Sequence, residues 1–481
     1  MKKKRLHILG IAGTFMAGIA TLAKELGYEV TGSDQHCYPP MSDYLESLGI
    51  EVFEGFESLE SLAILDEVDE IIIGNVMRRG MPVIEKMLDE KRELISGPAW
   101  LEEKVLRNRW VLCVTGTHGK TTTSSLLAWI LEFNGLKPGF LIGGIPSNFG
   151  VSAKLGEDPF FVIEGDEYDT GFFDKRSKFL HCRPNSLIIN NLEFDHADIF
   201  DDLKMIQRQF HHVLKILPSH GRVIYPKGIK SIEEVLSWGV FSEQDTVGLE
   251  GRWQARFKPE VKSGSGVGLG SDGSSFEVWC EEKLVGKVNW DLLGQHNVNN
   301  ALTAIAAAHH AGLKPEDAIQ ALANFKGVKR RMELKGNVGD VSVYDDFAHH
   351  PTAIETTLAG LKAHVKNSKK TKKTKNTGRV LAVFEPRSNT LKSGHGKEEL
   401  AKSFGLADEV YIFQSLAVKW DVKNIFKEVG IEAKIFLETE LLIQALVKNS
   451  QPGDHILIMS NGGFENIHAR LLKALAPLVT A

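Results

Sequence analysis

Cysteine is scarce in this sequence. The chain has four among its 481 residues, Cys37, Cys113, Cys182 and Cys280, and no two of them form a C-x-x-C pair. Disulfide frameworks and zinc sites need paired or closely spaced cysteines, so neither is indicated. The scatter is typical of a protein from a reducing compartment, and we expect a cytoplasmic protein.

An excess of either charge is also missing. The chain has 57 lysines and arginines against 62 acidic residues, a net charge of −5. This balance argues against a dedicated nucleic-acid-binding protein, although it leaves room for small anionic ligands at local basic sites. The lysine run at residues 369–375 is one local exception, and we assign it no function because such runs are usually solvated loops.

Long apolar runs are absent as well, since no stretch approaches the ~18–20 unbroken apolar residues that a membrane span needs. The N-terminus comes nearest, because Lys2–Arg5 precede an apolar segment that ends at Ala20, as in a secretory signal. Three glycines at turn-like spacing and a second apolar segment after Gly27 favour a different interpretation. We predict a strand, a glycine turn and a helix, and no association with a membrane.

Short apolar runs that end in polar turns and precede helical patterns recur along the chain, which is typical of parallel α/β sheets. The length predicts two to four domains. We place three: a Rossmann-like domain at 1–108, a central sheet with a phosphate loop at 109–331, and a Rossmann-like domain at 332–481. Residues 250–290 alternate aromatic and polar side chains among glycines, and we expect antiparallel strands there.

The segment Gly116–Thr121 reads Gly-Thr-His-Gly-Lys-Thr and lies between an apolar run and a helical pattern. Glycines let backbone N–H groups converge on phosphate, the helix N-terminus adds positive potential, and Lys120 would neutralise phosphate oxygens. The Thr121 hydroxyl would bind Mg²⁺. Val114 stands where the usual pattern has glycine, so the loop is a variant, and a plain glycine turn is the alternative.

Carboxylates follow two predicted strands. Glu164, Asp166, Glu167 and Asp169 come after the apolar run 160–163, and Asn190–Asp198 with His196 follow another. Because the carboxyl ends of parallel strands meet at one edge, both clusters should face the phosphate loop. Hard oxygen ligands and one imidazole suit Mg²⁺ that bridges ATP phosphates. For any single residue, an exposed acid without a role remains the alternative.

Three further constellations leave alternatives open. Gly10, Gly13 and Asp34 outline an incomplete dinucleotide pattern, G-x-x-G, which suits NAD or the diphosphate of a sugar nucleotide equally well. His296, Asn297 and Asn300 lie at a predicted helix start, where they could contact adenine or where Asn297 could cap the helix. Arg330 and Arg331 could reach a transferred phosphate or could be a salt-bridged linker.

Six motifs in order resemble the Mur ligases: GTHGKTTT, EGDEYD, NNLEFDHAD, GQHNVNNA, RRME and DDFAHHP. Four further segments resemble, within that family, the branch that attaches a peptide to UDP-N-acetylmuramate in peptidoglycan recycling. These segments are Gly32–Ser42, Phe172–Lys178, Glu385–Thr390 and Met459–Phe464. The resemblance extends over essentially the whole chain. It implies that the three domains hold, in order, a UDP-sugar, ATP and the incoming peptide.

The resemblance also implies the chemistry. The lactyl carboxylate of UDP-N-acetylmuramate would attack the γ-phosphate of ATP and form an acyl phosphate. The amine of L-alanyl-γ-D-glutamyl-meso-diaminopimelate would then attack that carbonyl, and phosphate would leave. This reaction needs charge neutralisation at the phosphoryl group more than it needs a nucleophilic side chain.

The residues that the resemblance assigns to each role are as follows. Lys120, His196 and Arg331 are catalytic; Gly116, Thr117, His118, Gly119, Lys120, Thr121, Thr122, His296, Asn297, Asn300, Arg331 and Asp346 bind ATP; Thr121, Glu164 and His196 bind Mg²⁺; Gly10, Ala12, Gly13, Thr14, Ser33, Asp34 and Asn75 bind the UDP-sugar; His349, Arg387, Ser388, Asn389 and Asn461 bind the peptide.

The sequence departs from the family pattern in three places. Gly165 stands where alanine is commoner, Glu465 and Asn466 replace a pair of glycines, and no lysine marks the position that other branches carbamylate. Two other functions stay open at this point. The L-alanine-adding branch shares every ATP motif. The other is a protein that binds a nucleotide for a different purpose. The incomplete dinucleotide pattern disfavours a nucleotide-sugar dehydrogenase, and the paired acid clusters disfavour a passive nucleotide-binding module.

Overall fold

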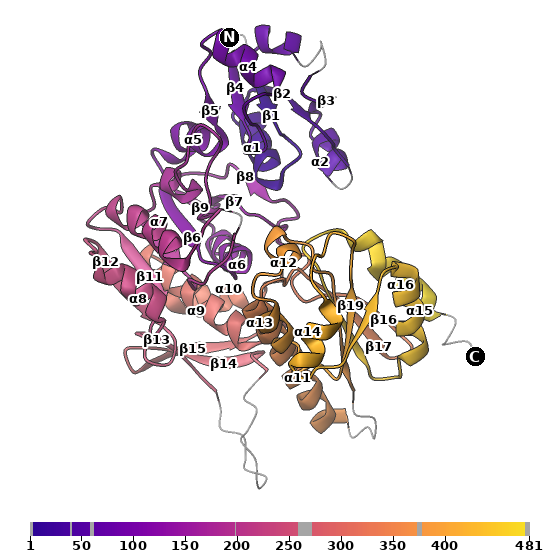
Figure 1. Ribbon diagram of the computed structural model, residues 1–481. Helices are drawn as coiled ribbons and strands as arrows, with labels where there is room; N and C mark the ends of the chain where they lie inside the picture. Colours follow the sequence, from indigo (N-terminus) through magenta and orange to yellow (C-terminus); the bar gives the residue numbers. More distant parts are fainter. Residues whose placement is uncertain are drawn as a thin grey trace. The chain divides into compact units, whose positions relative to one another are not determined.

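The structure is a computed structural model that describes residues 3–38, 41–57, 62–197, 199–257, 272–372 and 378–476, without the side chains of 368–372 and 389. The side chains of the lysine run therefore lie outside the described residues. The chain divides into two compact units (Figure 1). The first comprises Met1–Glu193, Leu203–Trp253 and Thr303–Leu322; the second comprises Phe194–Asp202, Gln254–Leu302 and Ala323–Ala481.

A five-stranded parallel sheet forms the N-terminal part of the first unit, in the order β3-β2-β1-β4-β5. β1 is central and leads through a glycine turn into α1, which confirms the predicted strand, turn and helix. The strands are β1 (Arg5–Leu9), β2 (Glu29–Asp34), β3 (Glu51–Glu54), β4 (Glu70–Ile73) and β5 (Ile95–Ser96); the helices are α1 (Thr14–Glu25), α2 (Met41–Ser47), η1 (Ile64–Asp66), α4 (Pro82–Asp89), α5 (Gly97–Leu101) and η2 (Glu102–Leu106).

A second sheet in the first unit has the order β12-β11-β10-β6-β9-β7, all parallel, with β8 antiparallel to β7. The strands are β6 (Trp110–Thr115), β7 (Gly139–Leu141), β8 (Ala153–Lys154), β9 (Phe160–Glu164), β10 (Ser186–Ile189), β11 (Arg222–Pro226) and β12 (Glu243–Val247). The helices are α6 (Lys120–Phe133), η3 (Lys178–Cys182), α7 (Leu203–Lys215), α8 (Lys230–Ser237) and α10 (Pro315–Leu322). The predicted strand, phosphate loop and helix are thus confirmed as β6, the loop and α6.

The predicted antiparallel region is confirmed only in part. β14 (Ser275–Cys280) and β15 (Lys283–Asn289) form an antiparallel hairpin in the second unit. At the start of β13 (Trp253–Arg256), however, Trp253 pairs in parallel with Val247 of β12, so the expectation is wrong there. Trp253 is fully buried and its indole donates to Asp245, which explains why an aromatic side chain stands at this position.

The second unit contains a six-stranded sheet in the order β16-β17-β21-β18-β19-β20, parallel except for β16. Residues of β18 alternate between two apolar clusters, with Val380, Ala382 and Phe384 in one and Leu381 and Val383 in the other, so both faces are buried. The strands are β16 (Glu333–Val338), β17 (Val341–Asp346), β18 (Val380–Phe384), β19 (Glu409–Phe413), β20 (Ala433–Phe436) and β21 (His455–Met459); the helices are α9 (Gln295–His310), α11 (Pro351–Lys372), α12 (Asn389–Ser393), α13 (Lys397–Lys402), α14 (Val422–Glu428), α15 (Thr439–Asn449), η4 (Phe464–Asn466) and α16 (Ile467–Leu475).

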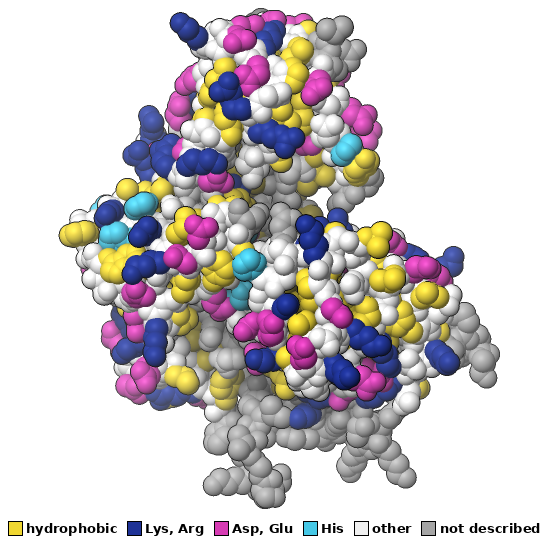
Figure 2. Space-filling view, viewed as in Figure 1, with side chains coloured by type: hydrophobic (Ala, Val, Ile, Leu, Met, Phe, Trp, Pro, Cys, Tyr) yellow, Lys and Arg dark blue, Asp and Glu magenta, His cyan; other side chains and the backbone are white. Residues whose placement is uncertain are grey.

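Charged side chains of both signs are interspersed on the surface. On the face in Figure 2, Lys and Arg side chains alternate with Asp and Glu side chains among the described residues. This mixture agrees with the small net charge of −5. Within the described part of the chain, no helix combines the length and the apolarity needed to cross a membrane.

The turn after β21 carries backbone strain where the sequence lacks the expected glycine pair. Phe464, Glu465 and Asn466 have φ angles of 42°, 47° and 55°, in the left-handed region that glycine tolerates. A residue with a Cβ there costs roughly 1–2 kcal/mol. Glu465 also forms an exposed ion pair with Arg470, at 3.3 Å.

We predict that Glu465→Gly stabilises the protein relative to Glu465→Ala by about 1 kcal/mol in urea-induced unfolding, because both changes delete the ion pair but only glycine relieves the strain. Glu465→Ala is the matched control, since it keeps the Cβ. Equal unfolding free energies for the two variants would contradict the assignment of strain to this residue.

Candidate active site

The phosphate loop connects β6 to α6 and depends on two glycines. Gly116 has φ 128° and Gly119 has φ 81°, conformations that residues with a side chain rarely adopt. A Cβ at Gly116 would lie 3.0 Å from the carbonyl oxygen of Asn191. Val114, which replaces the usual glycine, is a fully buried residue of β6. The variant spacing therefore arises because the strand continues to Thr115 before the loop begins.

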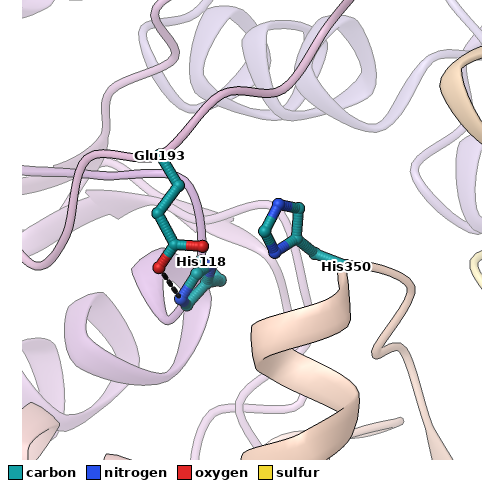
Figure 3. Close-up of side chains that lie close together, drawn as sticks. All are labelled: His118, Glu193 and His350. Atoms are coloured by element: carbon teal, nitrogen blue, oxygen red, sulfur yellow. Dashed lines mark ion pairs between the residues drawn. The ribbon is translucent and has the colours of Figure 1, made fainter. Parts of the chain in front are cut away.

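Hydrogen bonds tie the loop to the segment that follows β10. The His118 N–H donates to Asn191 Oδ1 at 2.9 Å, and Asn191 Nδ2 donates back to the His118 carbonyl at 3.0 Å. The Glu193 N–H donates to Thr117 Oγ1 at 2.9 Å. The His118 ring lies 3.4 Å from the Glu193 carboxylate (Figure 3). Hydrogen bonds to Asn191 and Glu193 therefore hold the backbone of the loop in its conformation.

Lys120 lies at the N-terminus of α6 with most of its side chain buried. Its ammonium donates to the Gly116 carbonyl at 2.7 Å and pairs with Glu167 at 3.5 Å and Asp166 at 3.8 Å. These two acids follow β9, so the prediction that the first acid cluster faces the phosphate loop is confirmed.

Thr121 and Glu164 have the oxygen chemistry that a divalent cation requires. The Thr121 hydroxyl donates to Glu164 Oε1 at 2.8 Å, and the Gly143 N–H donates to the other carboxylate oxygen. Burial raises the pKa of Glu164, and the charge of Asp166 raises it further. A cation beside this carboxylate would favour its charged form, so the two residues fit Mg²⁺. His196 belongs to the second unit, and its share in a metal site stays a prediction.

A cavity of about 460 Å³ lies in the first unit beside the glycine turn of β1 and α1. Asp34 holds this turn, because its carboxylate accepts the Ala12 N–H at 2.8 Å. Of the seven residues predicted to bind the UDP-sugar, six line the cavity: Gly10, Ala12, Gly13, Thr14, Asp34 and Asn75.

Ser33 is the exception among the predicted UDP-sugar residues. Its side chain is fully buried in the first sheet, where its hydroxyl lies 2.9 Å from the His7 ring. The alternation of side chains along β2 sends Ser33 and Asp34 to opposite faces. Its side chain therefore does not line the cavity, and its expected contact with the UDP-sugar stays a prediction.

Sequence reasoning missed four lining residues that can hydrogen-bond or carry charge: His36, Tyr168, Thr170 and Lys178. His36 and Lys178 lie in two of the segments that resemble the peptide-attaching branch, Gly32–Ser42 and Phe172–Lys178, and Tyr168 lies in the motif EGDEYD. These segments were therefore the available signal, although spacing alone could not place the residues in the cavity.

The predicted adenosine residues lie at the start of α9 in the second unit. His296 is partly exposed, and the burial of its ring, followed by the charge of Arg331, lowers its pKa to about 4. Asn297 Nδ2 donates to the Leu293 carbonyl at 2.7 Å, and Asn300 Nδ2 lies 3.3 Å from Asn297 Oδ1. The alternative that Asn297 caps the helix is wrong, because α9 begins at Gln295 and the Asn297 side chain donates a hydrogen bond.

The neighbouring residues Arg330 and Arg331 differ in their surroundings. The Arg330 guanidinium donates to the carbonyls of Ser460 and Gly462, at 2.7 and 2.6 Å, and pairs with Asp345 at 3.6 Å. It therefore acts as the salt-bridged linker that the sequence left as an alternative. Arg331 lies over the Phe347 ring, 5.0 Å from its centroid.

Asp346 lies beside the segment that carries these two arginines. Its carboxylate accepts the N–H groups of Met332 and Ala348, each at 2.7 Å. Burial raises its pKa, while the charge of Arg331 lowers it. The expected contact of Asp346 with ATP stays a prediction. In the structure, its carboxylate holds the backbone at Met332 and at Ala348.

The predicted peptide residues surround the carboxyl ends of β18 and β21. The half-exposed Arg387 lies 3.9 Å from Glu385 and packs against Gly462. The Ser388 hydroxyl caps α12 by accepting the Leu391 N–H. Asn461 Oδ1 is buried without a hydrogen-bond partner among the described atoms.

The other two predicted peptide residues add less. The partly buried His349 ring lies 3.1 Å from the Phe347 carbonyl. Burial lowers the pKa of this histidine. The Asn389 side chain lies outside the described residues, so nothing in the structure bears on its predicted contact.

The chain belongs to the Mur ligase family. Three family models match it: the Mur ligase family catalytic domain at residues 5–109, the Mur ligase middle domain at 114–308, and the Mur ligase glutamate ligase domain at 330–462. The resemblance predicted from the motifs is thereby confirmed, and so is the ligase class of the protein.

Within the family, the chain is similar to murein peptide ligases. It is 51% identical over 472 residues to the UDP-N-acetylmuramate–L-alanyl-γ-D-glutamyl-meso-2,6-diaminoheptandioate ligase of Escherichia coli, covering 98% of each chain. It matches the crystal structure of a murein peptide ligase from Psychrobacter arcticus with 43% identity and a TM-score of 0.71, covering 98% of this chain and 99% of the other. A UDP-N-acetylmuramate–L-alanine ligase from Endomicrobium trichonymphae is 29% identical, with 96% and 97% covered.

We predict that Lys120→Ala lowers the rate of phosphate release from ATP at least ~100-fold, because the loop loses the charge that faces the phosphates. Phosphate release measured with saturating substrates checks this. Lys137→Ala is the control, since Lys137 is an exposed lysine of the same unit whose ion pair with Glu157 lies on the surface. An activity within a few-fold of the parent protein would refute the role given to Lys120.

Proposed function

We propose that this chain joins the lactyl carboxylate of UDP-N-acetylmuramate to the L-alanyl amine of L-alanyl-γ-D-glutamyl-meso-diaminopimelate, with conversion of ATP to ADP and phosphate. The observation that carries the proposal is the 51% identity to a ligase of that name over 98% of both chains. An L-alanine ligase of the same family reaches only 29% over a similar length.

The geometry of the first unit supports both substrates. The 460 Å³ cavity beside Gly10 and Gly13 suits a sugar nucleotide, whose diphosphate would meet the N-terminus of α1. The loop between Gly116 and Thr121 suits the phosphates of ATP, with Lys120 facing the transferred group. A carboxylate oxygen then attacks the γ-phosphorus, ADP leaves, and an acyl phosphate is formed.

In the second step the peptide amine attacks the acyl carbon, phosphate leaves, and the amine nitrogen loses a proton. No side chain needs to act as a nucleophile, so the protein contributes alignment and neutralisation of charge. We assign Mg²⁺ to Thr121, Glu164 and His196, where it would neutralise phosphate charge. The Thr121–Glu164 pair supports this assignment through its oxygen ligands and its partly buried carboxylate.

The second unit supplies the remaining residues of the proposal. His296, Asn297, Asn300, Arg331 and Asp346 would contact ATP. The domain boundaries 1–108, 109–331 and 332–481 and a cytoplasmic location, where ATP is available, belong to the same proposal. For the peptide we assign His349, Arg387, Ser388, Asn389 and Asn461, which follow or adjoin the carboxyl ends of parallel strands.

Comparison of amine donors tests the proposed function. With UDP-N-acetylmuramate and ATP, we expect phosphate release to be at least ~10-fold faster with the tripeptide than with free L-alanine at equal concentration, because the tripeptide carries carboxylates on its second and third residues, remote from the reacting amine, that Arg387 can bind and that free L-alanine lacks. Mass spectrometry of the product identifies the new amide. Faster turnover with L-alanine would assign the protein to the alanine-adding branch instead.

We predict that Arg387→Ala raises the KM for the tripeptide about 10-fold and leaves the KM for ATP within twofold, since a charge-assisted hydrogen bond is worth about 1.5–3 kcal/mol. Steady-state kinetics with each substrate varied in turn measures both constants. Arg470→Ala is the matched control, because Arg470 is a surface arginine of the same unit that pairs with Glu440. Equal loss of ATP and peptide affinity would remove Arg387 from the peptide site.

A further inference from the structure

Lys178 is a buried lysine for which the reaction described above has no use. It begins η3, only 9% of its side chain is exposed, and it lines the 460 Å³ cavity of the first unit. Among the described residues that line this cavity, it is the only lysine or arginine. An anion in the cavity would therefore meet one full positive charge from a side chain, and that charge is Lys178.

The chain segment before Lys178 holds it in place. Residues 169–177 form a tight loop that is closed by an antiparallel bridge between Asp169 and Ser177. The Lys178 N–H donates to the Tyr168 carbonyl at 3.1 Å, directly beyond that bridge. Phe172 and Phe173, within the loop, pack against the apolar cluster of the first sheet. The ammonium is thus presented from a fixed backbone.

Aromatic rings, more than acids, surround the Lys178 ammonium. It lies 4.2 Å from the ring centroid of Tyr168 and 4.9 Å from that of Phe15, and 3.1 Å from the Tyr168 hydroxyl. Its carboxylate neighbour is Asp166, at 3.6 Å. Asp166 also pairs with Lys120 and accepts the Tyr168 hydroxyl at 2.8 Å, so its negative charge is shared. Lys178 therefore retains positive potential toward the cavity.

The position of Lys178 indicates which anionic group of a sugar nucleotide it would contact. The glycine turn and the N-terminus of α1 form the part of the cavity that suits a diphosphate. Lys178 and Phe15 also line a second, much smaller cavity, to which Glu164 contributes. Lys178 thus lies between the sugar-nucleotide cavity and the acid assigned to the metal, where the reacting end of the sugar must arrive.

We propose that Lys178 is a positioning residue that binds the lactyl carboxylate of the sugar nucleotide and holds it toward the phosphate loop. This inference rests on the proposed function. The Lys178 ammonium donates hydrogen bonds to one carboxylate oxygen, and the other oxygen remains available to attack the γ-phosphorus. Asp166, which contacts both lysines, sets the spacing between the carboxylate and Lys120.

Binding of two nucleotides to the full chain, measured by isothermal titration calorimetry, tests the proposal without catalysis. UDP-N-acetylglucosamine is the probe that lacks only the lactyl group of UDP-N-acetylmuramate. We expect Lys178→Met to weaken UDP-N-acetylmuramate binding roughly 10- to 100-fold, as the loss of a charged hydrogen bond predicts, and to change UDP-N-acetylglucosamine binding less than twofold. Equal losses for both nucleotides, or no loss for either, would overturn the role given to Lys178.

Two controls separate this role from a structural one. Lys175→Met changes an exposed lysine of the same loop and should leave both affinities unchanged. Lys178→Gln keeps a hydrogen-bond donor and replaces Lys178→Met if that variant does not fold, as judged by thermal unfolding; the same selective loss is expected. If the parent protein itself fails to bind UDP-N-acetylmuramate more tightly than UDP-N-acetylglucosamine, the proposed function fails, whatever Lys178 does.

Kinetics provide a second readout. Lys178→Met should raise the KM for UDP-N-acetylmuramate at least ~10-fold and leave the KM for ATP within twofold, because the ATP loop keeps Lys120. Lys178→Arg should recover part of the loss, since it restores a charge of similar reach. A rise in the ATP KM as large as the rise for the sugar nucleotide would contradict a role specific to the carboxylate.

Discussion

The carboxylate of Asp166 is the contact on which the chemistry of the first unit depends. It pairs with Lys120 at the phosphate loop and with Lys178 in the neighbouring cavity. Buried ammonium groups are unfavourable unless a counter-charge accompanies them, and one residue after β9 serves both. Burial lowers the pKa of Lys178, and Asp166 opposes that effect. Asp166 therefore contacts the lysines of both substrate regions, and its neighbour Glu167 adds negative charge beside both.

Local features of the fold could be predicted from the sequence. Apolar runs and glycines predict the N-terminal strand, turn and helix, and likewise β6, the phosphate loop and α6. Glycine is informative here because it tolerates the positive φ angles that these turns require. Six of seven residues expected at the sugar nucleotide line one cavity for the same reason, since they belong to one turn or to the ends of adjacent strands.

Features that depend on tertiary packing could not be predicted in this way. Ser33 and Asp34 are neighbours in sequence, yet only Asp34 reaches the cavity, because β2 directs their side chains to opposite faces. Arg330 and Arg331 are equally plausible ligands in the sequence. The Arg330 guanidinium, however, already donates hydrogen bonds to the carbonyls of Ser460 and Gly462, more than a hundred residues away. Lys178 was not predicted because its surroundings come from α1 and from the segment after β9, which only the folded chain brings together.

The place of β21 has a consequence for how the protein is made. This strand, His455–Met459, is synthesised after the other five strands of its sheet, yet it lies between β17 and β18 in the middle of that sheet. Until it leaves the ribosome, the two earlier strands have no common partner and expose edges that can pair wrongly. A nascent chain that stalls before β21 would carry this sheet as two separate parts, β16 with β17 and β18 with β19 and β20.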